Sequence, residues 1–355
     1  MRIAVIAPGY APSIGGVETV VTRVCESLAA RGCDIEVWAP RANSATPPVA
    51  TVDGVVVRRF ATTGTSRYRL SPQLWRHTER HADDFDVVHA HSYHSAAALG
   101  LAACARRTAV VVMSAHYHGV GHTAPARVLH RAYRPLGRRL VRGADALVAV
   151  SAAEEALLRR DFPAVTNRVT VVHNGADTDA IRRADPWPDQ PPTALVVGRL
   201  EPYKRVERTI GAFASGDADG QLVVIGDGPD RARLERLADG LERVRFLGRV
   251  SDADLARWWR TARVTATMSE HEAFGVVALE AVAGGGVALL SDIAAHREVA
   301  ALAGDECVLV HNDEDLAHHL QLSLQTANAG PRHVRSWSEV AEDYLSVYRR
   351  LLATK

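Results

Sequence analysis

Residues 185–192 read Asp-Pro-Trp-Pro-Asp-Gln-Pro-Pro, and the residues that follow, Thr-Ala-Leu-Val-Val-Gly at 193–198, begin a new apolar run. Four prolines in eight residues continue neither a helix nor a central strand. Short apolar runs alternate with amphipathic stretches before this segment, and the same alternation starts again after it. The segment therefore predicts a linker between two domains. The length of 355 residues agrees with this, because a chain of that length usually has more than one hydrophobic core.

Alternation of strand and helix is typical of a parallel, doubly wound α/β sheet. Strands are predicted from apolar runs such as IAVIA at 3–7 and DVVHAH at 86–91, and, after the linker, QLVVIG at 221–226 and VALLS at 287–291. We predict an α/β fold of two Rossmann-like domains, residues 1–184 and 193–335, joined by the linker at 185–192. Sheets of this kind bind ligands at the carboxyl ends of their strands, so we expect a central cleft that both domains face.

Charge and lysine usage exclude several classes of function. Lys and Arg total 42 against 41 Asp and Glu, so the chain lacks the positive field that nucleic-acid binding requires. Lys204 and Lys355 are its only lysines, and neither stands in the Gly-Lys-Ser/Thr context of a Walker loop. The four cysteines form no C-x-x-C pair, and the first apolar run is too short for a signal peptide. We expect a cytoplasmic protein.

Two cations follow the first strand after the linker, in the segment GRLEPYK at 198–204. Because this loop leaves a strand end, Arg199 and Lys204 are predicted to point into the cleft, where two cations suit a diphosphate. A solvated charged loop is the simpler alternative. The retention of Lys204 in a chain that uses arginine almost everywhere favours a functional role, because an ammonium and a guanidinium are not interchangeable.

The segment SEHEAFGVVALE at 269–280 follows a predicted strand and opens a predicted helix. Gly275 permits close approach of a ligand, and the backbone N–H groups of Val276 and Val277 would face an anion. A phosphate site is therefore predicted at the start of this helix.

Two carboxylates, Glu272 and Glu280, lie on either side of that helix start. They would be about 12 Å apart if the whole stretch were helical, so we expect them to bind two ends of one long ligand. A carboxylate can accept hydrogen bonds from two neighbouring hydroxyl groups of a sugar. We therefore expect Glu280 to bind a ribose and Glu272 to bind a second sugar, with the phosphates between them at the helix start. Such a ligand is a nucleotide sugar. For each glutamate alone, a charge that stabilises the helix N-terminus is the alternative.

Together these motifs resemble a known enzyme family. EAFGVVALE at 272–280, VGRLEPYK at 197–204 and VIGDGP at 224–229 are similar to retaining glycosyltransferases of the GT-B fold, glycosyltransferase family 4 in particular. SIGGVETVV at 13–21, SAHYHG at 114–119 and SWSEVAEDYLSVYRRLL at 336–352 extend the resemblance over nearly the whole chain. It implies that residues 336–355 form a helix that crosses back to the first domain.

The resemblance also implies roles for single positions. Gly15 and Gly16 match the glycine loop that approaches the donor phosphate, and His116 falls at the family's active-site histidine. His118 and His122 lie close to it, and a hydrogen-bonded structural histidine is the alternative. The predicted catalytic residues are His116, Glu272, Arg199 and Lys204. The predicted donor-binding residues are Gly15, Gly16, Arg199, Lys204, Val250, Glu272, Phe274, Gly275, Val276, Val277 and Glu280.

The predicted function is transfer of a hexosyl-type sugar, with retention, from a UDP- or GDP-sugar to a hydroxyl acceptor. The acceptor stays open among phosphorylated, lipid, polysaccharide and secondary-metabolite compounds. The resemblance implies no metal and no other cofactor, because Arg and Lys hold the diphosphate. A nucleotide-sugar epimerase or hydrolase of the same fold is the alternative. A non-enzymatic scaffold would tolerate loss of Lys204 or Glu272, and NAD binding lacks the G-x-G-x-x-G fingerprint.

Several features do not fit the pattern directly. The family usually has a proline where this chain has Val287, and commonly one where it has His173. His89, His91 and His94 could suggest a zinc site, but further ligands are not evident.

Residues 127–142, from Arg127 to Arg142, carry six arginines and no acidic residue. A solvated pair of helices interrupted at Pro135 is one interpretation. Attraction to an anionic acceptor and peripheral contact with the inner membrane face are the others, and the sequence does not separate them.

Overall fold

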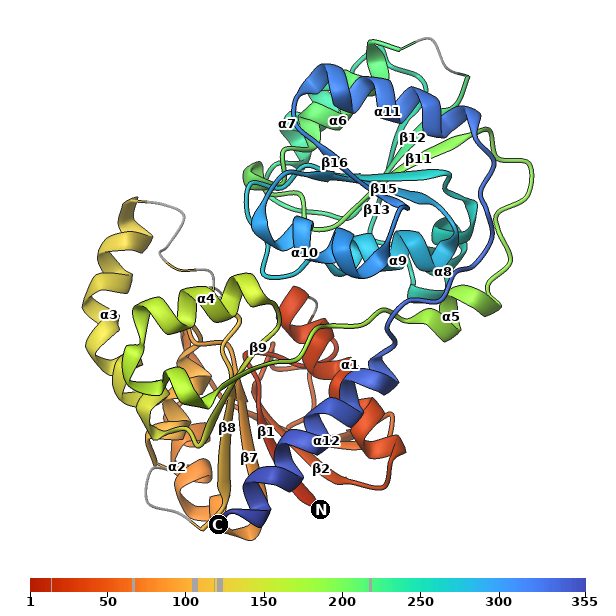
Figure 1. Cartoon of the computed structure of the whole chain (residues 1–355). Coiled ribbons are helices and arrows are strands. Elements are labelled where there is room, and N and C mark those ends of the chain that lie inside the picture. The colour runs from red at the N-terminus through yellow and green to blue at the C-terminus, as the bar shows by residue number, and fades with distance from the viewer. Residues whose placement is uncertain (14, 66–67, 104–107, 118, 120–123, 217–218) are drawn as a thin grey trace. The chain divides into compact units, whose positions relative to one another are not determined.

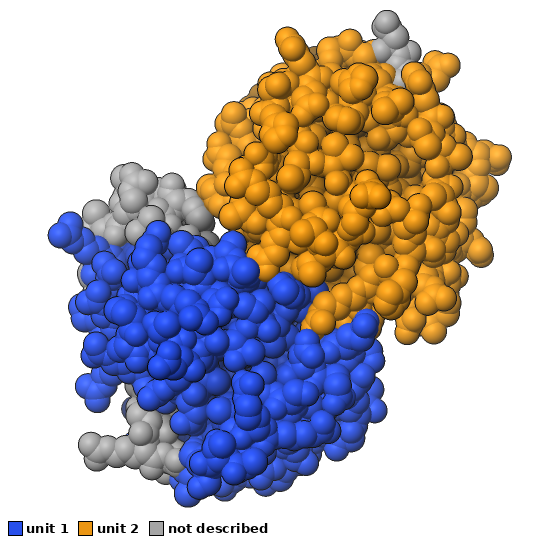
Figure 2. Space-filling model, in the orientation of Figure 1, with its two compact units in different colours: residues 1–174, 337–355 blue, residues 175–336 orange. Residues whose placement is uncertain are grey.

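The computed structural model describes the chain except residues 14, 66–67, 104–107, 118, 120–123 and 217–218 (Figure 1). The chain divides into two compact units, which Figure 2 colours separately. Unit 1 comprises residues 1–174 and 337–355, and unit 2 comprises residues 175–336. Each is an α/β unit built on its own sheet.

Unit 1 contains a sheet with the strand order β10-β9-β8-β7-β1-β2-β4-β3. Neighbouring strands are parallel except β3, which pairs antiparallel with β4 at the edge. The bounds are β1 (Arg2–Ile6), β2 (Asp34–Pro40), β3 (Val49–Val52), β4 (Val55–Phe60), β7 (Val87–His91), β8 (Val110–Ser114), β9 (Ala146–Ala149) and β10 (Val169–Val171). Strands β5 (Thr63–Thr65) and β6 (Tyr68–Leu70) form a separate antiparallel pair.

The central strands β7 and β8 are buried at every residue, which explains their continuous apolar sequence. The helices of unit 1 are α1 (Gly16–Ala30), α2 (Pro72–His81), α3 (Ala124–Gly143), α4 (Ala152–Asp161) and α12 (Trp337–Ala353), with short 3₁₀ segments at η1 (Ala82–Asp84), η2 (Ala96–Ala103) and η3 (Pro163–Arg168). Helix α12 packs on α1 and buries Tyr344 and Tyr348 completely. The predicted terminal helix thus belongs to unit 1.

Helix α3 corrects one sequence expectation, because it runs through Pro135 as a single helix and not as an interrupted pair. Proline removes one intrahelical hydrogen bond, which packing has to offset. Leu140 and Val141 of the helix are buried in the core, and Gly137 approaches Tyr93 so closely that a Cβ atom would overlap the ring.

Unit 2 has a parallel sheet with the order β13-β12-β11-β14-β15-β16. Its strands are β11 (Thr193–Val197), β12 (Gln221–Ile225), β13 (Val244–Gly248), β14 (Val264–Thr267), β15 (Val287–Ser291) and β16 (Cys307–Val310). Its helices are α5 (Thr178–Arg183), α6 (Val206–Ala214), α7 (Arg231–Leu237), α8 (Asp252–Thr261), α9 (Val276–Gly284), α10 (Ala294–Ala303) and α11 (Asp313–Gln325). Figure 1 shows α6, α7 and α11 on one face of this sheet and α8, α9 and α10 on the other.

The division lies at Asn174 and not at residue 184, because α5 packs against α8 and α9 of unit 2. Nor is the proline-rich segment a free linker. The guanidinium of Arg257 lies 3.5 Å from the centre of the Trp187 ring, and the backbone N–H of Trp187 donates to Thr261 Oγ1 at 2.8 Å. Segment 185–192 is therefore fixed on helix α8.

No helix among the residues that the structure describes is both long and apolar enough to cross a membrane.

Candidate active site

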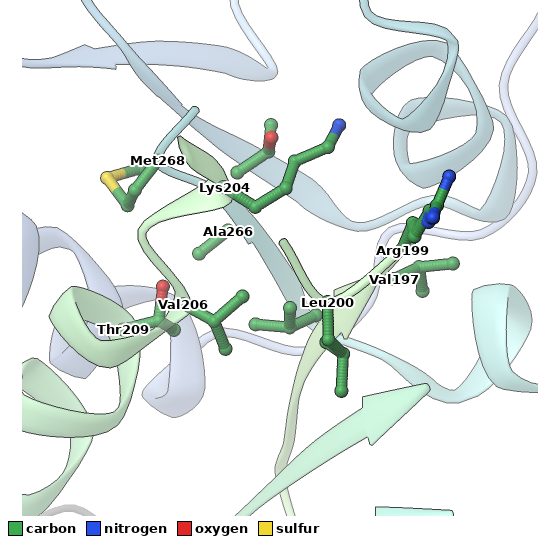
Figure 3. Close-up of a pocket in the computed structure, with 11 residues that line it drawn as sticks. Val197, Arg199, Leu200, Lys204, Val206, Thr209, Ala266 and Met268 are labelled. Atoms are coloured by element: carbon green, nitrogen blue, oxygen red, sulfur yellow. The ribbon is translucent and has the colours of Figure 1, made fainter. Parts of the chain in front are cut away.

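In unit 2 the loop after β11 lines a pocket (Figure 3). Gly198 turns the chain there with a φ of 143°, a conformation that strains any residue with a side chain. Arg199 follows, and the 3₁₀ segment η4 (Pro202–Lys204) returns Lys204 to the same pocket. Figure 3 shows the charged ends of both side chains extended toward the same side.

Lys204 and Glu272 form an ion pair at the centre of this region. Lys204 Nζ lies 2.5 Å from Glu272 Oε1, and the two side chains are only 20% and 18% exposed. Burial alone would lower the pKa of Lys204 and raise that of Glu272. Their mutual attraction outweighs burial, so the pKa of Lys204 is raised and the pKa of Glu272 is lowered. Both groups are therefore charged at neutral pH.

Glu272 is held in place from its own loop. The Ser269 hydroxyl donates to Glu272 Oε1 at 2.8 Å, and the Glu270 N–H donates to the Tyr203 carbonyl at 2.9 Å. The rings of Tyr203 and His271 stack with their centres 4.9 Å apart. These contacts join the loop of Glu272 to the loop of Lys204, so the two charged side chains are positioned together.

The same loop ends at the start of helix α9. Gly275 is the N-cap with a φ of 113°, and Val276 and Val277 supply the first N–H groups of the helix, which have no intrahelical partner by geometry. These groups carry partial positive charge, and binding of an anion by them stays a prediction. Glu272 lies before the helix, so the helical spacing of 12 Å between Glu272 and Glu280 does not apply.

The remaining predicted donor residues lie in three places. Phe274 is buried beneath the helix start, and Glu280 is half-buried one turn along α9. Val250 follows β13, and the Gly248 carbonyl there accepts from the Gly226 N–H at 2.8 Å. Gly15 and Gly16 lie in unit 1 at the start of α1, where a Cβ atom at Gly15 would overlap the Glu18 carboxylate.

His116 lies in unit 1 at the carboxyl end of β8. Its backbone adopts a left-handed φ of 46°, which is rare outside glycine and concentrates at functional sites. Its Nε2 lies 3.1 Å from His91 Nδ1, and burial lowers the pKa of His116 to about 4. The ring is therefore neutral at physiological pH. His118 and His122 lie outside the described residues.

Comparisons with known proteins match nearly the whole chain. Residues 14–180 match the family described as Glycosyltransferase Family 4, and residues 177–339 match Glycosyl transferases group 1. A GDP-mannose-dependent alpha-mannosyltransferase of Mycobacterium tuberculosis is 31% identical, with 98% of this chain and 96% of the relative covered. The chain belongs to glycosyltransferase family 4.

Two further comparisons agree with this family. A phosphatidyl-myo-inositol mannosyltransferase of Mycobacterium leprae is 30% identical, over 98% of this chain and 96% of the relative. Sucrose-phosphate synthase from Thermosynechococcus elongatus superposes with a TM-score of 0.80 at 21% identity, with both chains covered completely. The family 4 chain thus has the predicted GT-B fold. It is an enzyme that transfers a sugar from a nucleotide sugar to a hydroxyl acceptor, and the epimerase or hydrolase alternative is not favoured.

In this family 4 glycosyltransferase, sequence reasoning missed two buried residues that shape the site. His296 packs under Gly275, with Cδ2 3.3 Å from the position of a Cβ atom there, and its ring interacts electrostatically with Glu272. Glu154 accepts the Tyr117 N–H at 2.5 Å and the Val150 N–H at 2.7 Å, which fixes the loop behind His116. The pattern Ser151-x-x-Glu154 signalled only a helix cap.

His89, one of the histidines considered for zinc, is engaged in other bonds. His89 bonds Tyr348 through Nδ1 at 2.7 Å and Ser114 through Nε2 at 2.9 Å, so both ring nitrogens have protein partners. Over the described part of the chain, no group of three His, Cys, Asp or Glu side chains is arranged to hold a metal.

Proposed function

We propose that this enzyme transfers mannose, with retention, from GDP-mannose to an anionic hydroxyl acceptor. The observation that carries the proposal is the Lys204–Glu272 pair beside Arg199 and the start of α9. The choice of GDP-mannose is supported by the name of the Mycobacterium tuberculosis relative.

Each group of this site has a distinct role in the proposal. An ammonium has three donors and one of those on Lys204 faces Glu272, so the others are available to the diphosphate with Arg199. Both contacts of Glu272 use Oε1, which makes Oε2 the oxygen for a sugar hydroxyl. Glu280 binds the ribose, and the N–H groups of Val276 and Val277 bind phosphate oxygen.

In the proposed reaction the bond from the anomeric carbon to the diphosphate oxygen breaks, and a bond to the acceptor oxygen forms on the same face of the sugar. The acceptor proton passes to the departing phosphate oxygen. Negative charge therefore grows on the diphosphate, where Arg199, Lys204 and the helix start stabilise it without moving. We expect no metal to be required.

The acceptor is proposed to carry a phosphate next to the reacting polyol, free or as a lipid headgroup. Arg131, Arg138, Arg139 and Arg142 of α3 are exposed, and such a row attracts phosphate. The Mycobacterium leprae relative is named for a phosphorylated inositol lipid. The side chain of Arg127 lies outside the described residues. Contact of this helix with an anionic membrane remains part of the proposal.

Binding of GDP, UDP and ADP, without added metal, tests the donor assignment. We expect GDP to raise the melting temperature. At a concentration 100 times its dissociation constant, GDP would add roughly 2.7 kcal/mol to the free energy of unfolding. The Glu280→Ala and Arg199→Ala/Lys204→Ala variants should lose this shift, whereas Arg297→Ala, which removes an exposed arginine paired with Asp292, should keep it. Normal transfer by the double variant would refute the mechanism.

Initial rates with inositol phosphate and with inositol test the acceptor assignment. The phosphorylated compound should have the higher kcat/KM, and Arg138→Ser/Arg139→Ser should reduce only that value. Sedimentation with anionic and neutral vesicles separates a lipid source of the phosphate from a free one. Equal rates for the two acceptors would contradict an anionic acceptor.

A further inference from the structure

His91 and His116 form a buried hydrogen bond between two imidazole rings in unit 1. His91 Nδ1 lies 3.1 Å from His116 Nε2, and the rings are nearly parallel with centres 5.4 Å apart. His91 is fully buried, whereas His116 retains 7% of its exposure. A hydrogen bond needs one donor and one acceptor, so only one of the two facing nitrogens carries a proton. Each neutral ring carries a single N–H, so the position of this proton also fixes which of the other two ring nitrogens is protonated.

The surroundings of His91 decide which nitrogen carries it. Among the described residues, His91 Nε2 is buried without a hydrogen-bond partner. If His116 donated to His91, the proton of the neutral His91 would sit on Nε2, as a buried N–H with no acceptor. Such orphaned N–H groups are rare, whereas a bare acceptor is tolerated better. His91 therefore donates from Nδ1, and the proton of His116 is on its own Nδ1.

His91 packs against a second buried histidine that is itself held by hydrogen bonds. The centres of the His91 and His89 rings are 4.2 Å apart, and their planes are tilted by 37°. His89 is fixed in turn by Tyr348 of helix α12 at 2.7 Å and by Ser114 at 2.9 Å. The Ser114 hydroxyl also bonds Tyr344 of the same helix at 3.0 Å. Helix α12 thus supports His89, and through it His91, by way of Tyr348 and Tyr344.

The neighbouring backbone is also constrained. Ser92 follows β7 with a φ of 72°, and His116 follows β8 with a φ of 46°. The Ser92 N–H donates to the Ser114 carbonyl at 2.9 Å, which joins the two strand ends. Two left-handed non-glycine residues at adjacent strand ends are expected where a site is pre-organised.

We propose that His91 is a positioning residue that holds His116 in the tautomer with its proton on Nδ1. In this form His116 donates a hydrogen bond from Nδ1 to an oxygen of the sugar or acceptor, and Nδ1 does not act as a base. The function of the His116 Nδ1–H group rests on the proposed sugar transfer, in which the departing phosphate takes the acceptor proton. The tautomer of His116 does not depend on the proposed sugar transfer.

The test compares His91→Asn with His91→Leu in the full chain. The Asn amide occupies the place of Nδ1 and can donate to His116, whereas Leu has nearly the same shape and cannot. Long-range ¹H–¹⁵N spectra of ¹⁵N-histidine-labelled protein at pH 7.5 report which nitrogen of His116 is protonated, and a His116→Gln variant assigns the signals. Transfer rates with GDP-mannose and inositol phosphate are measured in parallel, with GDP affinity as the control.

We expect a protonated Nδ1 on His116 in the wild type and in His91→Asn, and a mixture of tautomers in His91→Leu. Transfer should fall about 10- to 100-fold in His91→Leu with GDP affinity unchanged, as for other ring-orienting partners, and recover to within a few fold in His91→Asn. Protonation of Nε2 in the wild type, or an unchanged tautomer in His91→Leu, would overturn the proposal. If the wild type transferred no sugar, the proposed function would fail while the spectra still decided the tautomer.

Discussion

The Lys204–Glu272 pair should stabilise unit 2 as well as bind the donor, and a double-mutant cycle with Lys204→Met and Glu272→Gln separates the two effects. Each single variant leaves one charge or polar group without its partner in a region where the side chains are about one-fifth exposed. Breaking a fully buried pair costs about 3–5 kcal/mol and an exposed one under about 1 kcal/mol. We expect a loss of about 2–3 kcal/mol for each single variant.

The double variant should be more stable than the sum of the single losses predicts, with a coupling energy of about 2 kcal/mol. For a unit of this size, each kcal/mol lowers the melting temperature by roughly 2–4 °C, so calorimetry resolves the difference. Transfer should stay low in all three variants, because the diphosphate and sugar contacts are lost even where stability returns.

A matched control is the pair of Arg297 and Asp292. Its N···O distance is also 2.5 Å, but the arginine side chain is 60% exposed, so its cycle should show coupling near zero. Strict additivity in the Lys204–Glu272 cycle, or equal coupling in both cycles, would refute the reasoning that burial makes this pair strong.

Two further predictions concern single residues. Gly275→Ala should destabilise the protein by about 1–2 kcal/mol and weaken GDP binding, because φ at this position is 113° and the new Cβ atom would press on His296. The control variant Gly211→Ala, in open space on α6, should be neutral or stabilising. Burial raises the pKa of Glu154 from 4.5 to about 7, so its stabilising contribution is complete below pH 4.5 and is lost as pH rises through 7. Urea unfolding should show this loss, about 3 kcal/mol, in the wild type but not in Glu154→Gln.

The strands and the loop motifs of unit 2 could be predicted because both depend on local sequence. The apolar runs were long enough to fix the parallel sheets, and the cation loop and the Glu272 segment each followed a strand. The ion pair between Lys204 and Glu272 could not be foreseen, since both side chains were expected to bind ligand and their separation depends on the order β11-β14 in the sheet.

The sequence-based predictions failed where the structure depends on packing between distant segments of the chain. Helix α3 passes Pro135 because Leu140 and Val141 are held in the core and Gly137 packs against Tyr93, and no local signal reports those contacts. The proline-rich segment 185–192 was predicted to link two domains, but it belongs to unit 2, where Trp187 packs against Arg257. His296 gave no signal because its neighbours in the site, Glu272 and Gly275, lie more than about 20 residues before it in the chain.

Helix α12 has a consequence for the order in which the chain folds as it is made. Residues 1–174 leave the ribosome first, but the partners of His89 and Ser114 on α12, Tyr348 and Tyr344, follow only after the whole of unit 2. At about 5–20 residues per second, the intervening 162 residues (336 − 174) take roughly 8–30 s. Unit 2 can therefore be synthesised completely before His89 and Ser114 of unit 1 form their hydrogen bonds to helix α12.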